Sequence, residues 1–216
     1  MEEIKKHIAH KNETTGAVQT VKEHDENTAK LCREYAVFEL KEFLYAIGLL
    51  HDVGKFQISF SKRIDGANIK VEHSTCGALA VKENYAIPQP MALMMEYCIA
   101  GHHSGIPDGG FPNDDMDKAT LCGRMKRKFE DFSEYKNELL LPKLDGLAWM
   151  KYLFQDCENK LENVIDKFAF LTRYVFSCLV DADSNDTAEF CKERELPRKL
   201  RADFPTCLQL VNAKLA

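Results

Sequence analysis

Apolar residues recur along most of the chain at the three- and four-residue spacing of an α-helix. The first stripe covers residues 17–35 and predicts one face of an amphipathic helix, with His24 in its middle. A second stripe predicts a helix over about 39–52 that carries His51 near its end, with Gly54 as the residue that stops it. Both histidines are therefore expected to face the core.

The rest of the chain is also predicted to be mainly helical. Period-two alternation is not sustained anywhere, and the segment 56–71 is interpreted as a turn-rich connection because it contains an Asp-Gly pair. The segment 168–182 is apolar nearly all round, so its helix is expected to be central. Helices are predicted at about 74–84, 88–100, 118–136, 145–155 and 160–183, with a short final helix in the tail that starts at 187.

The predicted fold class is therefore all-α, as a single globular domain over residues 1–216 without internal repeats. A motif-bearing core is expected over about 10–190, and residues 191–216 are interpreted as a C-terminal extension or the start of a linker. A chain of 216 residues is long enough to bury a sizeable core without disulfides.

Composition narrows the class of protein. Hydrophobic residues make up 45% of the chain and charged residues 29%, which excludes a disordered or low-complexity protein. No apolar run approaches the roughly 20 residues of a membrane span, and the N-terminus lacks the apolar stretch of a secretory signal. The formal net charge of −5 is unlike that of a simple nucleic-acid coat protein, although an enzyme that acts on nucleic acid at a metal site need not be basic.

The eight cysteines form neither a zinc-binding pattern nor a disulfide framework. No two of them lie within three residues of each other, and most lie in apolar stretches, as small buried residues do. We interpret them as free thiols in a reducing compartment, which predicts a cytoplasmic protein with no membrane partner.

Five of the seven histidines, together with two aspartates, are candidate metal ligands. Imidazole and carboxylate groups together suit divalent transition metals. A single member is uninformative, because a lone histidine on an apolar helix face is more often a core residue than a ligand. The adjacent pair His102–His103, in a glycine-flanked segment, has no packing rationale. Asp183 lies near a predicted helix end, where the helix dipole disfavours acids and calls for a compensating cation. The ordered set is His24, His51, Asp52, His73, His102, His103 and Asp183.

A two-metal site is one arrangement that these residues allow. Two metals roughly 3.5–4 Å apart can activate a water and stabilise both oxygens of a displaced phosphodiester. The carboxylate of Asp52 could bridge them. Lys55 follows His51 by four residues and shares its face if the helix continues, so its ammonium could hold a phosphate oxygen. The first metal would be held by His24, His51, Asp52 and Asp183, and the second by Asp52, His73, His102 and His103.

Several segments of the sequence resemble a known family. The order H…HD…D is the signature of the HD superfamily of metal-dependent phosphohydrolases. The segments HDVGKFQISFSKRI, EHSTCGALA, AGHHSG and FSCLVDADSNDTAEF, with QTVKEHDENTAKL before them, are similar to the HD nuclease domain of the CRISPR-associated type I helicase-nuclease. This resemblance covers about residues 10–190, nearly the whole chain.

The resemblance implies an all-helical, metal-dependent deoxyribonuclease that prefers single-stranded DNA. It implies two divalent ions (Mn, Ni, Co or Fe, with Mg as an alternative) held by the seven residues above. Asp183 is preferred to Asp181 because the last ligand of the superfamily follows an alanine. The resemblance also implies that Asp52 and Lys55 are the catalytic residues.

The partners implied by the same resemblance are single-stranded DNA, a helicase that is fused or acts in trans, and an RNA-guided CRISPR surveillance complex. The chain contains no G-x-x-x-x-G-K-[ST] phosphate loop. It is therefore expected to be either part of a longer helicase-nuclease or a separate nuclease subunit.

Two other functions stay open at this point. The chain could be an HD phosphohydrolase that acts on a nucleotide or cyclic nucleotide, or a catalytically inactive domain that only docks partners. The similarity of the EHS and GHH segments to the CRISPR branch disfavours the first alternative, and the presence of every expected ligand disfavours the second.

A basic run is the other candidate for substrate binding. Such groups can follow a phosphate backbone while aromatic rings stack on bases. A solvated helix face over two core phenylalanines is the favoured interpretation. The run consists of Lys118, Arg124, Lys126, Arg127 and Lys128, followed by Phe129 and Phe132.

Overall fold

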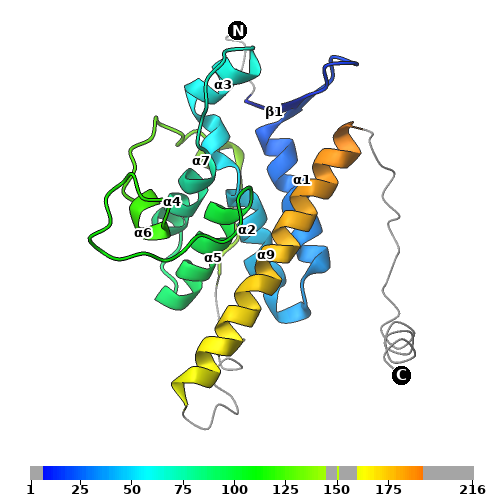
Figure 1. Cartoon of the computed structure of the whole chain (residues 1–216). Coiled ribbons are helices and arrows are strands. Elements are labelled where there is room, and N and C mark those ends of the chain that lie inside the picture. The colour runs from blue at the N-terminus through cyan, green and yellow to red at the C-terminus, as the bar shows by residue number, and fades with distance from the viewer. Residues whose placement is uncertain (1–6, 145–149, 151–159, 192–216) are drawn as a thin grey trace, which may run out of the picture.

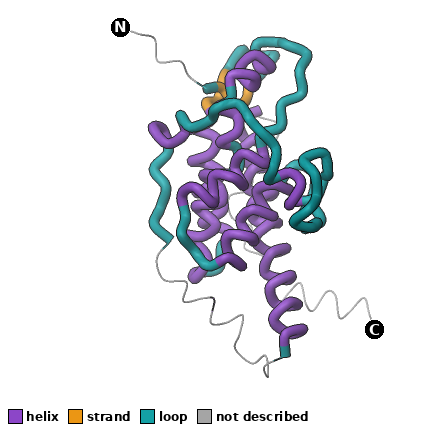
Figure 2. Tube along the Cα trace, turned by 90° about the vertical axis from the view of Figure 1, so that its left-hand side faces the viewer, coloured by secondary structure: helices purple, strands orange, loops and turns teal. Residues whose placement is uncertain are grey.

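The computed structural model describes residues 7–144, 150 and 160–191. The regular secondary structure of this part of the chain is helical apart from one small hairpin, and loops connect the helices (Figures 1 and 2). The all-α fold class is confirmed. The helices are α1 (Val21–Tyr35), α2 (Lys41–Leu50), α3 (Ile58–Ile64), α4 (Ser74–Asn84), α5 (Gln89–Gly101), α6 (Leu121–Arg124), α7 (Tyr135–Glu138) and α9 (Leu161–Cys191), with the 3₁₀ turns η1 (Phe38–Leu40) and η2 (Val53–Phe56).

The hairpin was not expected from the sequence. Strands β1 (Ile8–Lys11) and β2 (Val18–Thr20) pair antiparallel and lead directly into α1 (orange in Figure 2). Strands of four and three residues are too short to show a period-two pattern, which explains why the alternation was missed.

Helix α1 begins at Val21, four residues after the start of the predicted stripe at 17, because Thr20 caps it and residues 18–20 form β2. The hydroxyl of Thr20 accepts a hydrogen bond from the backbone of Glu23, whose side chain accepts one from the backbone of Thr20 in return. This start places Val21, His24 and Thr28 on one buried face of the helix. The sequence prediction that His24 faces inward is thus confirmed.

The centre of the fold is α2, which corrects the expectation that the last long helix would be central. Seven of the ten residues of α2 are buried, and α1, α4, α5 and α9 all contact it. Helix α9 instead runs antiparallel beside α1 at the edge of the bundle (Figure 1) and buries one face only. Phe170 on its outer face is 73% exposed. The apolar stretch 168–182 therefore contributes one buried stripe to the core. Phe168, Leu171, Tyr174 and Phe176 beside it are half-buried and pack against the core.

Helix α9 also extends eight residues beyond the predicted end at 183. Asp183 is consequently well inside the helix, and the macrodipole argument that was applied to it is wrong. The longer helix carries one more acid, Asp186, on the buried face. The prediction of a helix over 145–155 and of a short final helix in the tail lies largely outside the described residues, although residues 187–191 belong to α9.

The predicted helices at 74–84 and 88–100 are confirmed by α4 and α5. Two other expectations are wrong. The connection over 56–71 contains the two-turn helix α3. The segment 118–136 is not one helix but a series of turns around α6, because its basic side chains bind backbone carbonyls and Glu72 instead of pointing to solvent.

The segment after α2 is shaped by a close approach to α4. Helix α2 ends at Leu50, close to the predicted end at 52, and His51 and Asp52 follow it as the chain turns into η2. The helix does not continue to Lys55, so the condition for Lys55 to share the helix face of His51 is not met. A Cβ on Gly54 would lie 2.6 Å from the Cα of His73 and against its carbonyl oxygen. Only glycine fits here. The close approach brings the segment that carries His51 and Asp52 next to His73.

We expect Gly54→Ala to lower the free energy of unfolding by about 1–3 kcal/mol, because the new methyl group meets rigid backbone of His73. Chemical denaturation measures this change. Gly109→Ala is the matched control, since a Cβ at Gly109 meets only the hydroxyl end of the flexible Tyr97 side chain. Equal stability of the two variants would contradict the close-packing explanation.

Candidate metal centre

All the candidate ligands come together in the interior of the fold, some within helices and some at helix ends. The packing of α1, α2, α4, α5 and α9 brings residues that are far apart in the sequence to one place. The contributions are His24 from α1, His51 and Asp52 from the end of α2, His73 from the N-cap of α4, His102 and His103 from the end of α5, and Asp183 from α9.

Asp52 lies at the centre of the cluster and is 1% exposed. Its Oδ2 atom lies 3.3 Å from Nε2 of His24 and 3.5 Å from Nε2 of His51. Its Oδ1 atom lies 3.2 Å from Nε2 of His73 and 3.4 Å from Nε2 of His102. The two oxygens of one carboxylate thus face two different pairs of histidines.

Asp183 completes the group on the Oδ2 side of Asp52. Its Oδ1 atom lies 3.2 Å from Nε2 of His24 and 3.9 Å from Nε2 of His51. Asp181, which the sequence analysis considered as the alternative to Asp183, is exposed on α9. The structure therefore brings Asp183 into the cluster and leaves Asp181 outside it.

His103 completes the group on the other side. Its Nε2 atom lies 2.8 Å from Nε2 of His73, and the ligand atoms of Asp52, His73, His102 and His103 all lie within 4.8 Å of one another. His103 is the most exposed member of this set. This half of the cluster is therefore the one closer to solvent.

Hydrogen bonds of the histidines fix which ring nitrogen faces the centre. Nδ1 of His51 donates to the carbonyl of Gly48 at 2.7 Å, and Nδ1 of His102 donates to the carbonyl of Ile99 at the same distance. Each ring keeps the lone pair of Nε2 for a ligand when it is neutral. These two Nε2 atoms, Nε2 of His24 and Oδ1 of Asp52 are buried without a hydrogen-bond partner among the described residues.

Buried polar atoms without partners are costly, and metal binding is a common explanation for them. The orphaned atoms here are the donor types that divalent transition metals prefer, and they converge on one carboxylate. The residues present therefore fit the divalent metal ions that the sequence analysis expected, and the cluster could bind them.

The protonation of the two halves differs. Burial alone would lower the pKa of His24, but neighbouring carboxylates, first of all that of Asp183, hold this pKa well above its usual value. Burial lowers the pKa of His102, and burial together with His102 lowers the pKa of His103 to about 4. Since a histidine must be neutral to bind a metal, binding at the His24 half would release protons, whereas the imidazoles of His102 and His103 are already neutral at pH 7.

Lys55 lies inside the cluster and not at its surface. It is 4% exposed, and its ammonium lies 2.6 Å from Oδ2 of Asp52 and 3.4 Å from Nε2 of His10. Burial would raise the pKa of Asp52, but Lys55 and the surrounding histidines hold it well below the usual range. The lysine thus keeps Asp52 ionised, while its predicted contact with a phosphate stays a prediction.

Asp186 is a residue that sequence reasoning missed. Nδ1 of the fully buried His24 donates a hydrogen bond to Oδ2 of Asp186 at 2.7 Å, and the amide of Gln19 donates to the same oxygen at 2.7 Å. Carboxylates in this position fix the orientation of a ligating histidine and raise its basicity. The signal was present, because Asp186 follows Asp183 by one helical turn, but it required a helix that continues beyond 183.

Asp25 is the second missed residue. It is completely buried, and its carboxylate lies 3.7 Å from Nδ1 of His51 and within 4.8 Å of ligand atoms of His24 and Asp52. Burial raises the pKa of Asp25 to about 8, so it is largely protonated at neutral pH. Its position directly after His24 in the sequence gave no sign of this, because the two side chains point in different directions from the helix.

We expect Asp186→Asn to weaken divalent metal binding by about 10–100-fold, because an amide supports the basicity of His24 less than a carboxylate does. Isothermal titration with Mn²⁺ measures the change without any catalytic readout. Asp181→Asn is the matched control, an exposed acid on the same helix. Unchanged affinity in Asp186→Asn would show that His24 does not depend on this hydrogen bond.

The basic run between Lys118 and Lys128 does not form a free cationic surface. Arg124 and Arg127 both form ion pairs with Glu72, and Lys126 donates to the carbonyls of Pro112 and Asp114. The favoured interpretation of a solvated helix face is also wrong, because the two arginines tie the segment to the loop that precedes α4 and Lys126 ties it to the loop that follows α5.

An all-helical domain with a buried cluster of histidines and aspartates is typical of metal-dependent hydrolases. The protein-family comparison supports this class, because the model described as "HD domain" matches residues 21–141, more than half of the chain. The chain therefore belongs to the HD domain family, a superfamily of metal-dependent phosphohydrolases. Asp183 and Asp186 lie beyond the matched range. No curated protein matches the chain in the corresponding search.

None of the helices in the described ranges combines the length and apolar character that a membrane crossing requires. The free cysteines among the described residues are Cys32, Cys76, Cys98, Cys122, Cys178 and Cys191.

Proposed function

We propose that the chain is a metal-dependent nuclease that hydrolyses DNA phosphodiesters, prefers single-stranded DNA and acts in CRISPR type I interference. In this role it would work with a helicase, fused or in trans, and an RNA-guided surveillance complex. The motifs HDVGK, EHS, GHH and VDADSND, whose residues meet in one cluster, support the nuclease branch of the HD superfamily.

The observation that carries the proposal is the placement of Asp52. Its two oxygens face two groups of imidazoles, with Nε2 of His24 and His51 on one side and Nε2 of His73 and His102 on the other. Such an arrangement suits two metals that share one carboxylate. We assign one metal to His24, His51, Asp52 and Asp183, and the other to Asp52, His73, His102 and His103.

Two bound divalent metals would supply an activated water and Lewis-acid stabilisation of the phosphodiester oxygens. The protein residues keep the ligands in the correct form for this chemistry. The carbonyls of Gly48 and Ile99 hold His51 and His102 with Nε2 directed at Asp52. Asp186 holds His24 in the same way.

Lys55 is proposed to act during the reaction as a local cation. Its ammonium lies inside the cluster, 2.6 Å from Oδ2 of Asp52 and 5.6 Å from the centre of the Phe60 ring. With Asp52 engaged as a ligand, the ammonium of Lys55 would be available to a phosphate oxygen, where it would stabilise developing negative charge.

The test is cleavage of circular single-stranded DNA by the purified chain. After chelation, Mn²⁺, Co²⁺, Ni²⁺ and Mg²⁺ are titrated separately, and circular double-stranded DNA and a cyclic dinucleotide are offered in parallel. We expect metal-dependent linearisation of the single-stranded circle, slower cleavage of the duplex and no hydrolysis of the cyclic dinucleotide. Hydrolysis of the cyclic dinucleotide alone would overturn the proposal in favour of a small-substrate phosphohydrolase.

A further inference from the structure

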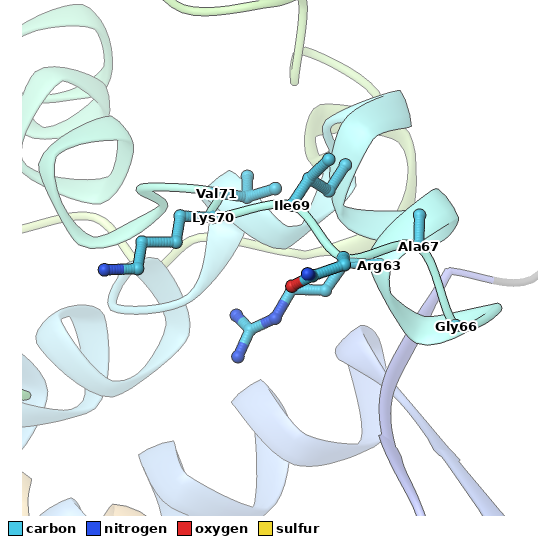
Figure 3. Close-up of a pocket in the computed structure, with 7 residues that line it drawn as sticks. Arg63, Gly66, Ala67, Ile69, Lys70 and Val71 are labelled. Atoms are coloured by element: carbon cyan, nitrogen blue, oxygen red, sulfur yellow. The ribbon is translucent and has the colours of Figure 1, made fainter.

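A cleft at the surface is lined by the chain that leads from α3 to α4 (Figure 3). Its volume is about 670 Å³, and its lining residues lie between Arg63 and Val71. The Arg63 guanidinium and the Lys70 amine extend from this segment toward the same side. We call this surface the Arg63–Lys70 cleft.

The two cations of the cleft differ from the other basic groups in this region. Arg124, Arg127 and Lys126 are all bound to carboxylates or backbone carbonyls. No ion pair or hydrogen bond of the Arg63 or Lys70 side chain is present among the described residues, and both residues are exposed. The cleft therefore presents positive charge that the protein itself does not neutralise.

Arg63 of the cleft and His73 of the candidate metal centre both lie near the aromatic ring of Phe60. The guanidinium of Arg63 lies 5.7 Å from the ring centre of Phe60, and the ring of His73 lies 5.5 Å from the same centre. The ammonium of Lys55 also lies beside this ring, at 5.6 Å. The distance from the Arg63 guanidinium to the His73 ring is therefore at most the sum of their two distances to the Phe60 ring centre. A few nucleotides of a DNA backbone span this distance.

The sign of the charge fits an anionic polymer. The segment 62–71 carries Lys62, Arg63 and Lys70 against the single carboxylate Asp65, although the whole chain has a net charge of −5. On a protein with a negative net charge, a local cluster of positive charges attracts phosphates to that cluster, while the rest of the surface repels them. Arginine and lysine side chains in an open cleft bind the backbone of single strands without reading their sequence.

We propose that the Arg63–Lys70 cleft binds the phosphates of single-stranded DNA that flank the phosphodiester at the metal centre. This inference rests on the proposed nuclease function and specifies where the substrate enters. The guanidinium of Arg63 and the ammonium of Lys70 donate to backbone phosphate oxygens on the side of His73. A small phosphodiester does not reach the cleft and does not depend on it.

The test compares the Arg63→Gln/Lys70→Gln double variant with the wild-type chain. Binding of a fluorescent oligo-dT is measured by anisotropy in chelator, where no cleavage occurs, over a series of salt concentrations. We expect binding to weaken about tenfold and the slope of log affinity against log salt to fall by about 1.4, because two phosphate contacts are lost. Metal-dependent hydrolysis of bis-p-nitrophenyl phosphate should be unchanged.

The matched control is Lys82→Gln/Arg173→Gln, which removes one lysine and one arginine from exposed faces of α4 and α9. It should bind oligo-dT as the wild type does. The proposal that the cleft binds DNA would be overturned if the cleft variant had the affinity and salt slope of the wild type. It would also be overturned if the wild type did not bind oligo-dT. A wild type that binds oligo-dT through the cleft but hydrolyses no phosphodiester with any metal would overturn the proposed nuclease and leave the cleft in place.

Discussion

Asp52→Ala is expected to remove bound divalent metal from both halves of the cluster and to slow phosphodiester hydrolysis by about 10³-fold. The reason is that each oxygen of this carboxylate faces a separate pair of histidines, so one substitution affects both groups at once. Metal ions contribute several kcal/mol to the stabilisation of the transition state, and about 4 kcal/mol corresponds to this loss of rate.

Two measurements check this prediction. Metal content after loading and desalting gives the stoichiometry, and hydrolysis of bis-p-nitrophenyl phosphate gives the rate. Asp181→Ala, which removes an exposed acid of α9, should keep both. If Asp52→Ala retains the metal content and the rate of the wild type, Asp52 does not bridge two metals.

Lys55→Met is expected to lower the free energy of unfolding of the chelated protein by about 3 kcal/mol. The substitution keeps most of the length of the side chain but removes the cation from a carboxylate that is 1% exposed. A buried charge that loses its partner costs about 3–5 kcal/mol, and the lower end applies here because histidines also surround Asp52. Added Mn²⁺ should restore much of the lost stability, since it supplies positive charge to the same carboxylate.

Urea unfolding with chelator and with Mn²⁺ measures both parts of this prediction. Lys30→Met is the control, because Lys30 is exposed on α1 and surface substitutions away from buried charges change stability by no more than about 0.5 kcal/mol. A Lys55→Met variant as stable in chelator as the wild type would mean that the ion pair with Asp52 is not a net contributor to the fold.

Periodicity and capping signals determined most of the helices. The stripe through His24, the Pro-rich start of α5 and the small residues of α4 led to helices that the structure confirms. These signals are local, since each helix forms its hydrogen bonds within a few residues. The same local reasoning failed at 118–136, where Arg124 and Arg127 pair with Glu72 more than 50 positions earlier in the chain.

The candidate site was accessible from the sequence because its members are chemically unusual. Histidines are few, and the seven predicted ligands appear in an order that resembles a family signature. The structure brings all seven together around Asp52. Their assignment to two metals stays a prediction until metal is measured.

The sequence by itself determined the all-helical class, the inward face of α1 that carries His24 and the list of side chains that could bind metal. Only the tertiary structure decided that α2 is central, that Asp183 and not Asp181 faces His24, and that Asp186 accepts a hydrogen bond from His24. Such choices depend on which faces of distant helices meet, and the hydrophobic pattern of one helix does not contain that information. The tight fit of Gly54 against His73 is an example. The position of the segment that follows α2 is set by the backbone at the start of α4, which is distant in the sequence.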